Sequence, residues 1–310
     1  ATWAPSKDLN VEVGARLEVS KISATVSGAD SEKTLNFVKP RLNLSWSPAK
    51  GHQLGLRAER LVDQLSFGSF LSNASFETDI FGVGNPDIEP ARRWEFEARY
   101  ERQFGGQNSF VAKLVHSELD HIIASVVIIL PPDSAAPGLQ VQIPRNVAEA
   151  SRDVLDLNGS LELDGLGMKG GLFQVGANIQ TSHTIDPVTG FERSLSNNQD
   201  WAWNGTLSQT LDGGAFRWSV FASNYSSSTS YSPQSISRNS HESIYGGASF
   251  SWRPAPGWTI GGSINRIFNV KDHYTFILFD EPRDTGSEAY RERFWSPVYS
   301  SATLSIRKNF

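Results

Sequence analysis

The sequence has no cysteine among its 310 residues, a single methionine and no long apolar run. The absence of cysteine excludes disulfides, thiol chemistry and cysteine metal sites, and it is compatible with an oxidising compartment. The longest apolar stretch, 122–130, is about half of the roughly 18 residues that a membrane-spanning helix needs, and it contains Ser125. A helical membrane protein is therefore excluded.

No strong excess of one charge sign is present either. The 33 acidic and 28 basic residues give a formal net charge of −5 and are well mixed along the chain. The sequence therefore predicts no basic surface of the kind that binds nucleic acid, and we expect no nucleic-acid partner. A mildly polar mean hydropathy is also what a β-barrel with one apolar and one polar face would average to.

What the sequence does contain is alternation of apolar and polar residues with a period of two. In 9–20, for example, every second residue from Leu9 to Val19 is apolar and its neighbours are polar. Successive side chains of a strand point to opposite faces, so such a segment has one apolar and one polar face. The pattern predicts about 12 strands, near 9–23, 35–47, 53–62, 92–104, 109–123, 151–163, 172–183, 200–211, 216–226, 243–253, 258–269 and 295–310.

The connections between these segments alternate in length. Short turns are predicted at 48–52, 105–108, 164–171, 212–215 and 254–257, and long polar loops near 63–91, 124–150, 184–199, 227–242 and 270–294. Outer-membrane barrels are wired in this way, with short turns on one side and long loops on the other. We therefore predict an all-β fold, a transmembrane antiparallel up-and-down β-barrel whose domain occupies residues 1–310.

The charged rows of the strands decide which face meets lipid. A basic side chain on the lipid face at mid-membrane costs roughly 2–4 kcal/mol. The charged rows should therefore point into the lumen; they include Glu12, Arg16, Glu18, Glu95, Glu97, Arg99 and Glu101. Tryptophans lie near the segment ends, where they would form interfacial girdles: Trp3, Trp46, Trp94, Trp201, Trp203, Trp252, Trp258 and Trp295.

A small Trp-x-Pro repeat bears on whether further strands precede the first residue. Trp-x-Pro occurs at 3–5, 46–48 and 252–254, and the second and third copies close a strand and open a short turn. By analogy, 1–3 is the tail of an earlier strand, so we expect a C-terminal portion of a larger barrel. The alternative, left open here, is an independent barrel of about 12 strands.

The last residues alternate and finish on Phe310. This ending resembles the C-terminal strand signature that the barrel-assembly machinery recognises, although Lys308 stands where an apolar or aromatic residue is usual. The downstream end of the barrel is therefore expected to be complete.

The segment 84–90, Gly-Asn-Pro-Asp-Ile-Glu-Pro, resembles the Asn-Pro-x-Leu-x-Pro motif of TonB-dependent receptor barrels. Asn85, Pro86 and Pro90 match the motif, and Glu97 matches the glutamate of the strand that follows it. Ala91 departs from the glutamate usual after the motif. Downstream, Asp120-His121-Ile122 is similar to the family's Asp-x-Ile before the next loop.

The resemblance implies a 22-stranded barrel closed by an N-terminal plug domain, which takes up scarce nutrients with energy relayed by the TonB complex. Typical cargoes are ferric siderophores, haem, cobalamin and oligosaccharides. The plug and roughly ten strands would lie upstream of this sequence. The implied partners are the TonB complex, reached through the plug, the barrel-assembly machinery, outer-membrane lipid with lipopolysaccharide, and a small-molecule or glycan ligand. The implied location is the bacterial outer membrane.

No catalytic or metal-binding pattern stands out, so neither an enzyme nor a cofactor is expected. The six histidines are scattered without metal-ligand spacing, and Asp212-Gly213-Gly214 is a turn rather than a phosphate loop, because no helix follows it. An outer-membrane lipid hydrolase would need a Ser/His pair at the lipid-facing rim, where tryptophan and glycine stand instead.

Binding residues concentrate in loops held by rigid scaffolds. The candidates here are aromatic and polar residues able to stack on and hydrogen-bond a sugar or an aromatic chelate: Tyr225, Tyr231, His273, Tyr274 and Phe276. Two functions remain open, an energy-coupled nutrient receptor and a free-standing barrel acting as a passive channel or autotransporter translocator. The sequence does not identify the cargo.

Overall fold

A computed structural model describes residues 1–26, 29–65, 73–75, 80–82, 85, 87–130, 132, 138–147, 149–241, 244–268 and 270–309. This part of the chain consists of β-strands joined by turns and loops, with two short 3-10 turns at Asp164–Leu166 and Asp212–Gly214. The expected all-β, antiparallel up-and-down architecture is confirmed.

No helix within the described ranges has both the length and the apolar character needed to cross a membrane.

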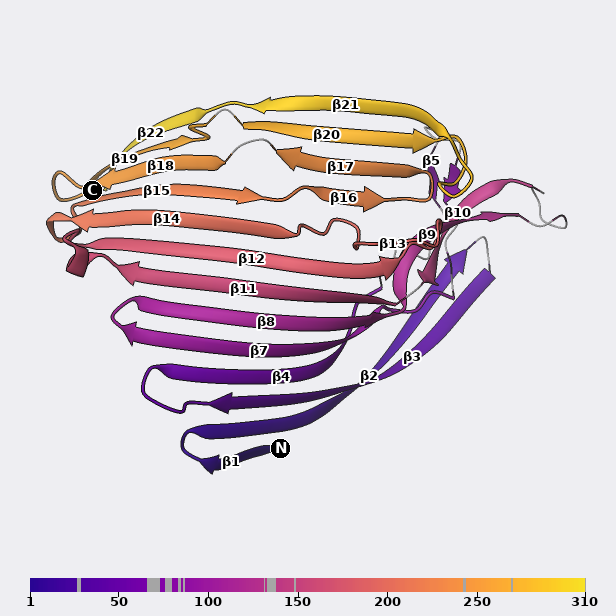
Figure 1. Cartoon of the computed structure of the whole chain (residues 1–310), viewed down its shortest axis with the longest axis horizontal. Helices are drawn as coiled ribbons and strands as arrows, with labels where there is room; N and C mark the ends of the chain where they lie inside the picture. Colours follow the sequence, from indigo (N-terminus) through magenta and orange to yellow (C-terminus); the bar gives the residue numbers. More distant parts are fainter. Residues whose placement is uncertain are drawn as a thin grey trace.

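The main sheet follows chain order almost without interruption, so that each strand pairs with the next antiparallel strand (Figure 1). Strand β13 (Glu192–Arg193) pairs with β12 beside this path. The path runs through β1 (Thr2–Ser6), β2 (Leu9–Val26), β3 (Ala29–Trp46), β4 (His52–Val62), β7 (Arg92–Gly105), β8 (Asn108–Asp120), β11 (Ala150–Glu162), β12 (Gly171–Ile185), β14 (Trp201–Leu211), β15 (Phe216–Tyr225), β18 (Tyr245–Trp252), β19 (Trp258–Asn265) and β22 (Ser301–Lys308).

Each of the 12 predicted strands has a counterpart in this sheet. The strand tail expected at 1–3 lies in β1, which continues through Pro5 to Ser6, so the turn comes later than predicted. The predicted loops were wrong in part, because they contain further strands. The loop regions 227–242 and 270–294 hold β16 (Ser228–Tyr231), β17 (Ser235–His241), β20 (Val270–Phe279) and most of β21 (Glu288–Val298), which form a second sheet. These strands prolong β15, β18, β19 and β22 (Figure 1). The sequence did not predict them because they lack strict alternation of apolar and polar residues: β16 and β17 are rich in serine, and β20 ends in the continuous apolar run Phe276–Phe279.

The third sheet lies within two other predicted loops. It contains β5 (Asn73–Ser75), β6 (Ile80–Gly82), β10 (Gln140–Val147) and β9 (Ile122–Ile129) in that order. Strand β10 pairs in parallel with β6 and antiparallel with β9. The sheet gathers at the end of the molecule where the longer connections lie (Figure 1), here called the loop end.

The opposite, short-turn end depends on glycine at tight positions. Gly51, between β3 and β4, has φ +75°, and a Cβ built there would lie 2.3 Å from the carbonyl oxygen of Gln103. Only glycine fits this turn without strain. Such turns let neighbouring strands follow one another directly.

The two faces of the main sheet differ sharply. One, the apolar face, carries large hydrophobic side chains that remain exposed, such as Leu17 at 69% and Leu304 at 71%. The buried hydrophobic residues among those described are few: Leu35, Phe37, Ile88, Val115, Val141 and Ala150. A water-soluble protein buries such side chains, and exposed apolar patches of this extent mark contact with a membrane or another protein.

The height of the apolar face fits a bilayer. Strand β14 has 11 residues, which at about 3.3 Å each and a tilt of about 45° give roughly 25 Å, the height of the apolar band of outer-membrane barrels. Exposed tryptophans stand at both limits, with Trp201 at the loop end and Trp46, Trp252 and Trp258 at the short-turn end. This is the arrangement expected of aromatic girdles.

Candidate functional site

The second face of the main sheet, the ionic face, carries the charged rows. At its centre Arg57 of β4 bonds to three carboxylates from β4 and β7, those of Glu59 (3.1 Å), Glu97 (3.0 Å) and Glu95. Their side chains are only 13–32% exposed. Further pairs on this face are Arg99–Glu101 (2.7 Å), Lys113–Asp156 (2.8 Å), Lys39–Glu18 (2.6 Å) and Arg41–Glu12. The predicted separation of charged from apolar rows is thus observed along these strands, whereas toward the loop end His116, stacked on Phe96 of the apolar face, bonds to Asp153 (2.7 Å) and Glu118 (2.9 Å).

A cavity of about 390 Å³ lies at the loop end, among segments that are distant in sequence. Strand β9 supplies an apolar wall with Ile122 and Ile123, and the turn after β12 adds Val188. The polar part of the lining comes from Arg193, Tyr231 and Arg283, together with four serines, Ser125, Ser196, Ser230 and Ser232. The lining is therefore apolar on one side and cationic on the other.

Asp186, behind this cavity, holds the two arginines. Its side chain is 2% exposed, and it accepts hydrogen bonds from Arg193 Nε (2.5 Å) and from Arg283 Nη2 (2.7 and 2.9 Å). The backbone N–H groups of Val188 and Thr189 donate to it as well. Burial alone would raise the pKa of Asp186, but these hydrogen bonds, that from Arg283 first, outweigh burial and hold the pKa at about 2.

Tyr231 lies against both guanidinium groups. The Cζ atoms of Arg193 and Arg283 are 4.4 and 5.6 Å from the centre of its ring. Both distances are within the range of cation–π attraction. Tyr231 was selected from the sequence, whereas the charged residues around it were not.

The other predicted ligand residues lie on β15 and β20. Tyr225 stacks on Tyr245, with ring centres 6.3 Å apart and planes inclined by 2°, and the Tyr245 hydroxyl donates to Asp272 Oδ1 at 2.5 Å. His273 follows Asp272 on β20, and Tyr274 packs on Phe294 of β21 at 4.8 Å between ring centres. Phe276 faces Ser237 of β17 in the register. The structure thus does not bring the five candidates together in one site: Tyr231 lines the loop-end cavity, and His273 points to the opposite face of β20 from Tyr274 and Phe276.

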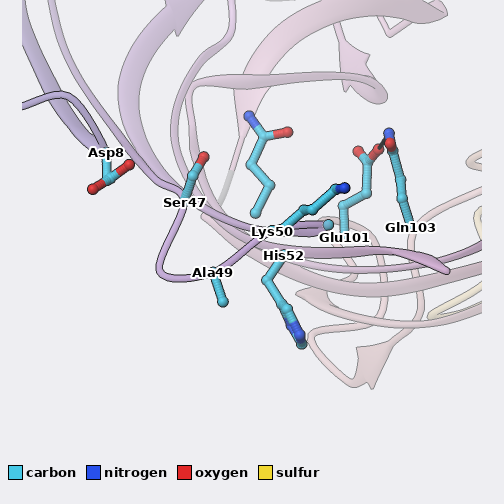
Figure 2. A pocket seen from close by; sticks show the side chains of 9 residues that line it. Asp8, Ser47, Ala49, Lys50, His52, Glu101 and Gln103 are labelled. Carbon is cyan, nitrogen blue, oxygen red and sulfur yellow. Dashed lines mark hydrogen bonds between the residues drawn. The ribbon is translucent and has the colours of Figure 1, made fainter. Parts of the chain in front are cut away.

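A second pocket, of about 290 Å³, lies at the short-turn end. In Figure 2, Lys50, Glu101 and Gln103 rise on one side of the ribbon, while His52 points to the other side. Glu101 already accepts from Arg99 (2.7 Å) and from Gln103 (2.8 Å). Within the described ranges no group of three or more His, Asp or Glu side chains is placed to hold a metal ion, here or elsewhere.

Comparison with known proteins decides the family. The sequence profile described as "TonB dependent receptor-like, beta-barrel" matches residues 1–270. The chain belongs to this family. None of the curated proteins compared with it matches in sequence.

Solved structures of TonB-dependent receptors share the fold at low sequence identity. The FrpB iron transporter from Neisseria meningitidis aligns with 98% of this chain and 44% of its own, with a TM-score of 0.64 and 11% identity. The ferric enterobactin receptor PfeA from Pseudomonas aeruginosa, in complex with enterobactin, aligns with 98% of this chain and 44% of its own, with a TM-score of 0.63 and 13% identity. The copper transporter OprC aligns with 99% of this chain and 47% of its own, with a TM-score of 0.70 and 9% identity. The chain therefore spans less than half the length of these receptor chains.

The receptor-family motif at 85–90 is tied into the loop end by side-chain hydrogen bonds. Asn85 Nδ2 donates to the carbonyl oxygen of Pro144 on β10 (2.9 Å), and Asn85 Oδ1 accepts from the N–H of Asp87 (2.9 Å). Ile88 is fully buried and Pro90 is buried. Gly84, Pro86 and, at the end of the chain, Phe310 lie outside the described residues. Glu97 is the motif-associated glutamate that bonds to Arg57.

Asn146 of β10 joins this motif to the second family signature. Its Nδ2 donates to the carbonyl oxygens of Glu89 and of His121, both at 2.8 Å, and its Oδ1 accepts from the N–H of Glu89 at 2.7 Å. His121 has φ 57°, a left-handed conformation that is rare outside glycine and marks the bend between β8 and β9. The Asp-x-Ile signature is therefore a strand bend, stabilised from β10.

Sequence reasoning missed Asp186, Arg193, Arg283 and Tyr245. One signal was available, since Asp186-Pro187-Val188-Thr189-Gly190 has the composition of a turn in which an aspartate caps backbone N–H groups. The arginines carry no such signal. Arg283 lies 97 residues from Asp186, and only the folded loops bring them together.

Proposed function

We propose that the chain is the barrel part of an outer-membrane receptor for the energy-coupled uptake of a scarce nutrient. The observation that carries this proposal is the exposed apolar face, bounded by tryptophans and backed by an ionic face. In a bilayer the apolar face contacts acyl chains and the ionic face lines an enclosed lumen. A transporter rather than an enzyme is the function that such a scaffold supports.

The ionic face suits a plug domain. Arg57 is shared by three partly buried carboxylates, so this part of the lumen has more acid than base. Partly buried carboxylates need cationic or hydrogen-bonding partners. A plug with basic side chains would supply them, and through it the TonB complex would act.

The pairing of the strands favours a larger barrel over a free-standing one. Strands β1 and β22 end the path of the main sheet and do not pair with each other among the described residues. An independent 12-stranded channel or autotransporter translocator would close between its first and last strands. The open edges fit strands contributed by the rest of a receptor barrel. The barrel-assembly machinery remains the proposed partner for insertion.

The cargo is proposed as a ferric siderophore, haem, cobalamin or an oligosaccharide. FrpB and OprC are described as an iron and a copper transporter, and PfeA as the ferric enterobactin receptor, which supports a metal-containing cargo. Tyr225, Tyr231, His273, Tyr274 and Phe276 are proposed to contact ligand from the loop end.

The test uses a strain that lacks the full-length receptor. Its growth on single sources of iron, cobalamin or glycan is measured with and without the receptor supplied again, and with tonB present or deleted. The proposal expects that the receptor restores growth on one source and that restoration requires tonB. Uptake that persists without tonB would instead support a passive channel.

A further inference from the structure

We propose that the apolar face of the main sheet carries a binding groove for one kind of membrane lipid, a phospholipid whose head group ends in an ammonium. The inference rests on the proposed placement of this face in a bilayer, and it goes beyond the receptor function by naming a lipid partner. It starts from a groove of about 350 Å³ formed by β3, β4, β7 and β8. With His116 at one end, the other side chains that line it on the apolar face are Leu42, Leu56, Ala58, Phe96, Ala98 and Leu114. Arg57 and Glu97 border it as well, but their side chains bond to each other on the ionic face.

Two alanines create the hollow. Ala98 of β7 lies between Leu56 and Leu114 in the register, and Ala58 of β4 lies beside Phe96. The two leucines and Phe96 are about half exposed, so they stand above the methyl side chains as walls. A hydrocarbon chain that lies in such a groove contacts walls and floor together, and it gains more dispersion energy than on a flat surface.

An ionic trio, His116, Glu118 and Asp153, lies at the loop-end limit of the groove. His116 Nδ1 is 2.7 Å from Asp153 Oδ1, and His116 Nε2 is 2.9 Å from Glu118 Oε1. Both ring nitrogens donate only when the imidazole is protonated, so the trio makes both bonds as one imidazolium and two carboxylates. It then carries one net negative charge, and a neutral imidazole would leave two.

The strands on either side do not neutralise the trio. Arg60 is paired with Asp120 at 2.6 Å, and Arg92 is paired with Glu89. On β11 and β12 the register places an uncharged serine beside Glu118 and an uncharged threonine beside Asp153. Ionisable side chains on a surface that meets lipid are costly, and where they occur they mark functional sites.

An ammonium head group fits both parts of this surface. It has three N–H donors and one positive charge, so it can donate to Glu118 and Asp153 together and neutralise the trio. Both carboxylates are accessible, since their side chains are 57% and 51% exposed. The acyl chain of the same lipid would fill the groove beside them. A phospholipid without the ammonium presents only its negative phosphate, which the trio repels.

The test is native mass spectrometry of the purified full-length receptor with an equimolar mixture of dioleoyl phosphatidylethanolamine and dioleoyl phosphatidylglycerol, which differ only in the head group. The inference expects preferential retention of phosphatidylethanolamine. Glu118→Gln and Asp153→Asn should each lower that retention roughly three- to tenfold. Glu192→Gln is the matched control and should have no effect, because Glu192 is similarly exposed and bonds to His183 but does not line the groove.

The groove itself is tested by a change that leaves the trio intact. Ala98→Leu fills the hollow and should lower lipid retention, whereas Ala177→Leu, on the same face of β12 but outside the groove, should not. Equal retention of the two lipids by the unaltered receptor would overturn the inference. Equal losses with Glu118→Gln and Glu192→Gln would overturn it too. Either result would leave tonB-dependent growth intact, so failure of this inference is distinguishable from failure of the receptor function.

Discussion

At the scale of single residues, two ionic clusters differ in what holds them. Arg57 lies within β4 of the main sheet and is shared by three carboxylates. Asp186 lies in the turn that follows β12 and is shared by two arginines. The first cluster has surplus negative charge and the second surplus positive charge, so removal of the central residue has opposite electrostatic consequences.

Replacing Arg57 should expose the mutual repulsion of Glu59, Glu95 and Glu97. Arg57→Met is expected to destabilise the folded receptor by about 1–3 kcal/mol, below the value for fully buried pairs because these side chains are partly exposed. The measurement is urea unfolding of the receptor in detergent micelles. Arg99→Met is the control and should cost under about 1 kcal/mol, because the Arg99 side chain is 48% exposed. Equal losses of unfolding free energy in the two variants would show that the bonds of Arg57 to three carboxylates stabilise the fold no more than the single exposed pair of Arg99 does.

The low pKa of Asp186 predicts a pH dependence of the loop cluster. A carboxylate whose pKa is lowered from 3.8 to about 2 stabilises the fold fully above pH 3.8, and this contribution is lost as the pH falls through 2. Hydrogen exchange of residues 186–193 should therefore be constant from pH 7 to about pH 4 after correction for intrinsic rates. Protection should then decline toward pH 2. Loss of protection already at pH 6 would contradict the assigned hydrogen bonds.

At the scale of elements, the strand bend at His121 is the clearest strained point. His121→Gly removes the left-handed penalty but adds chain entropy to the unfolded state, so stability should change by less than about 1 kcal/mol. His121→Val should cost about 1–2 kcal/mol, because a β-branched residue tolerates positive φ poorly. Thermal unfolding of the two variants provides the comparison. A larger loss with glycine than with valine would mean that the imidazole, not the backbone, matters here.

How far an element could be predicted depends on which solvent it faces. Strands such as β2 and β12 have one apolar and one polar face, so their alternation is strict and the sequence predicts them within a few residues. Strands β16, β17, β20 and β21 have polar residues on both faces, so they show no strict alternation of apolar and polar residues from which a strand could be predicted. The loop cluster was less predictable still. Asp186 and Arg283 meet only because two loops pack together, and no local pattern records that contact.

At the scale of the whole molecule, everything follows from one assignment of faces. If the apolar face meets acyl chains, the exposed leucines, the tryptophan girdles and the paired charges of the opposite face are all explained together. The ligand-binding proposals then have a direction, because the loop end faces the side from which a nutrient arrives.

The absence of cysteine from this chain makes that assignment directly measurable. Single cysteines placed along β12, at odd positions such as Val175→Cys and at even positions such as Gln174→Cys, can carry an environment-sensitive fluorophore in the full-length receptor reconstituted into vesicles. Brominated lipid should quench the label at Phe173, Val175, Ala177 and Ile179, and aqueous iodide should quench it at the intervening positions. Quenching that does not alternate, or that alternates with the opposite phase, would contradict the account.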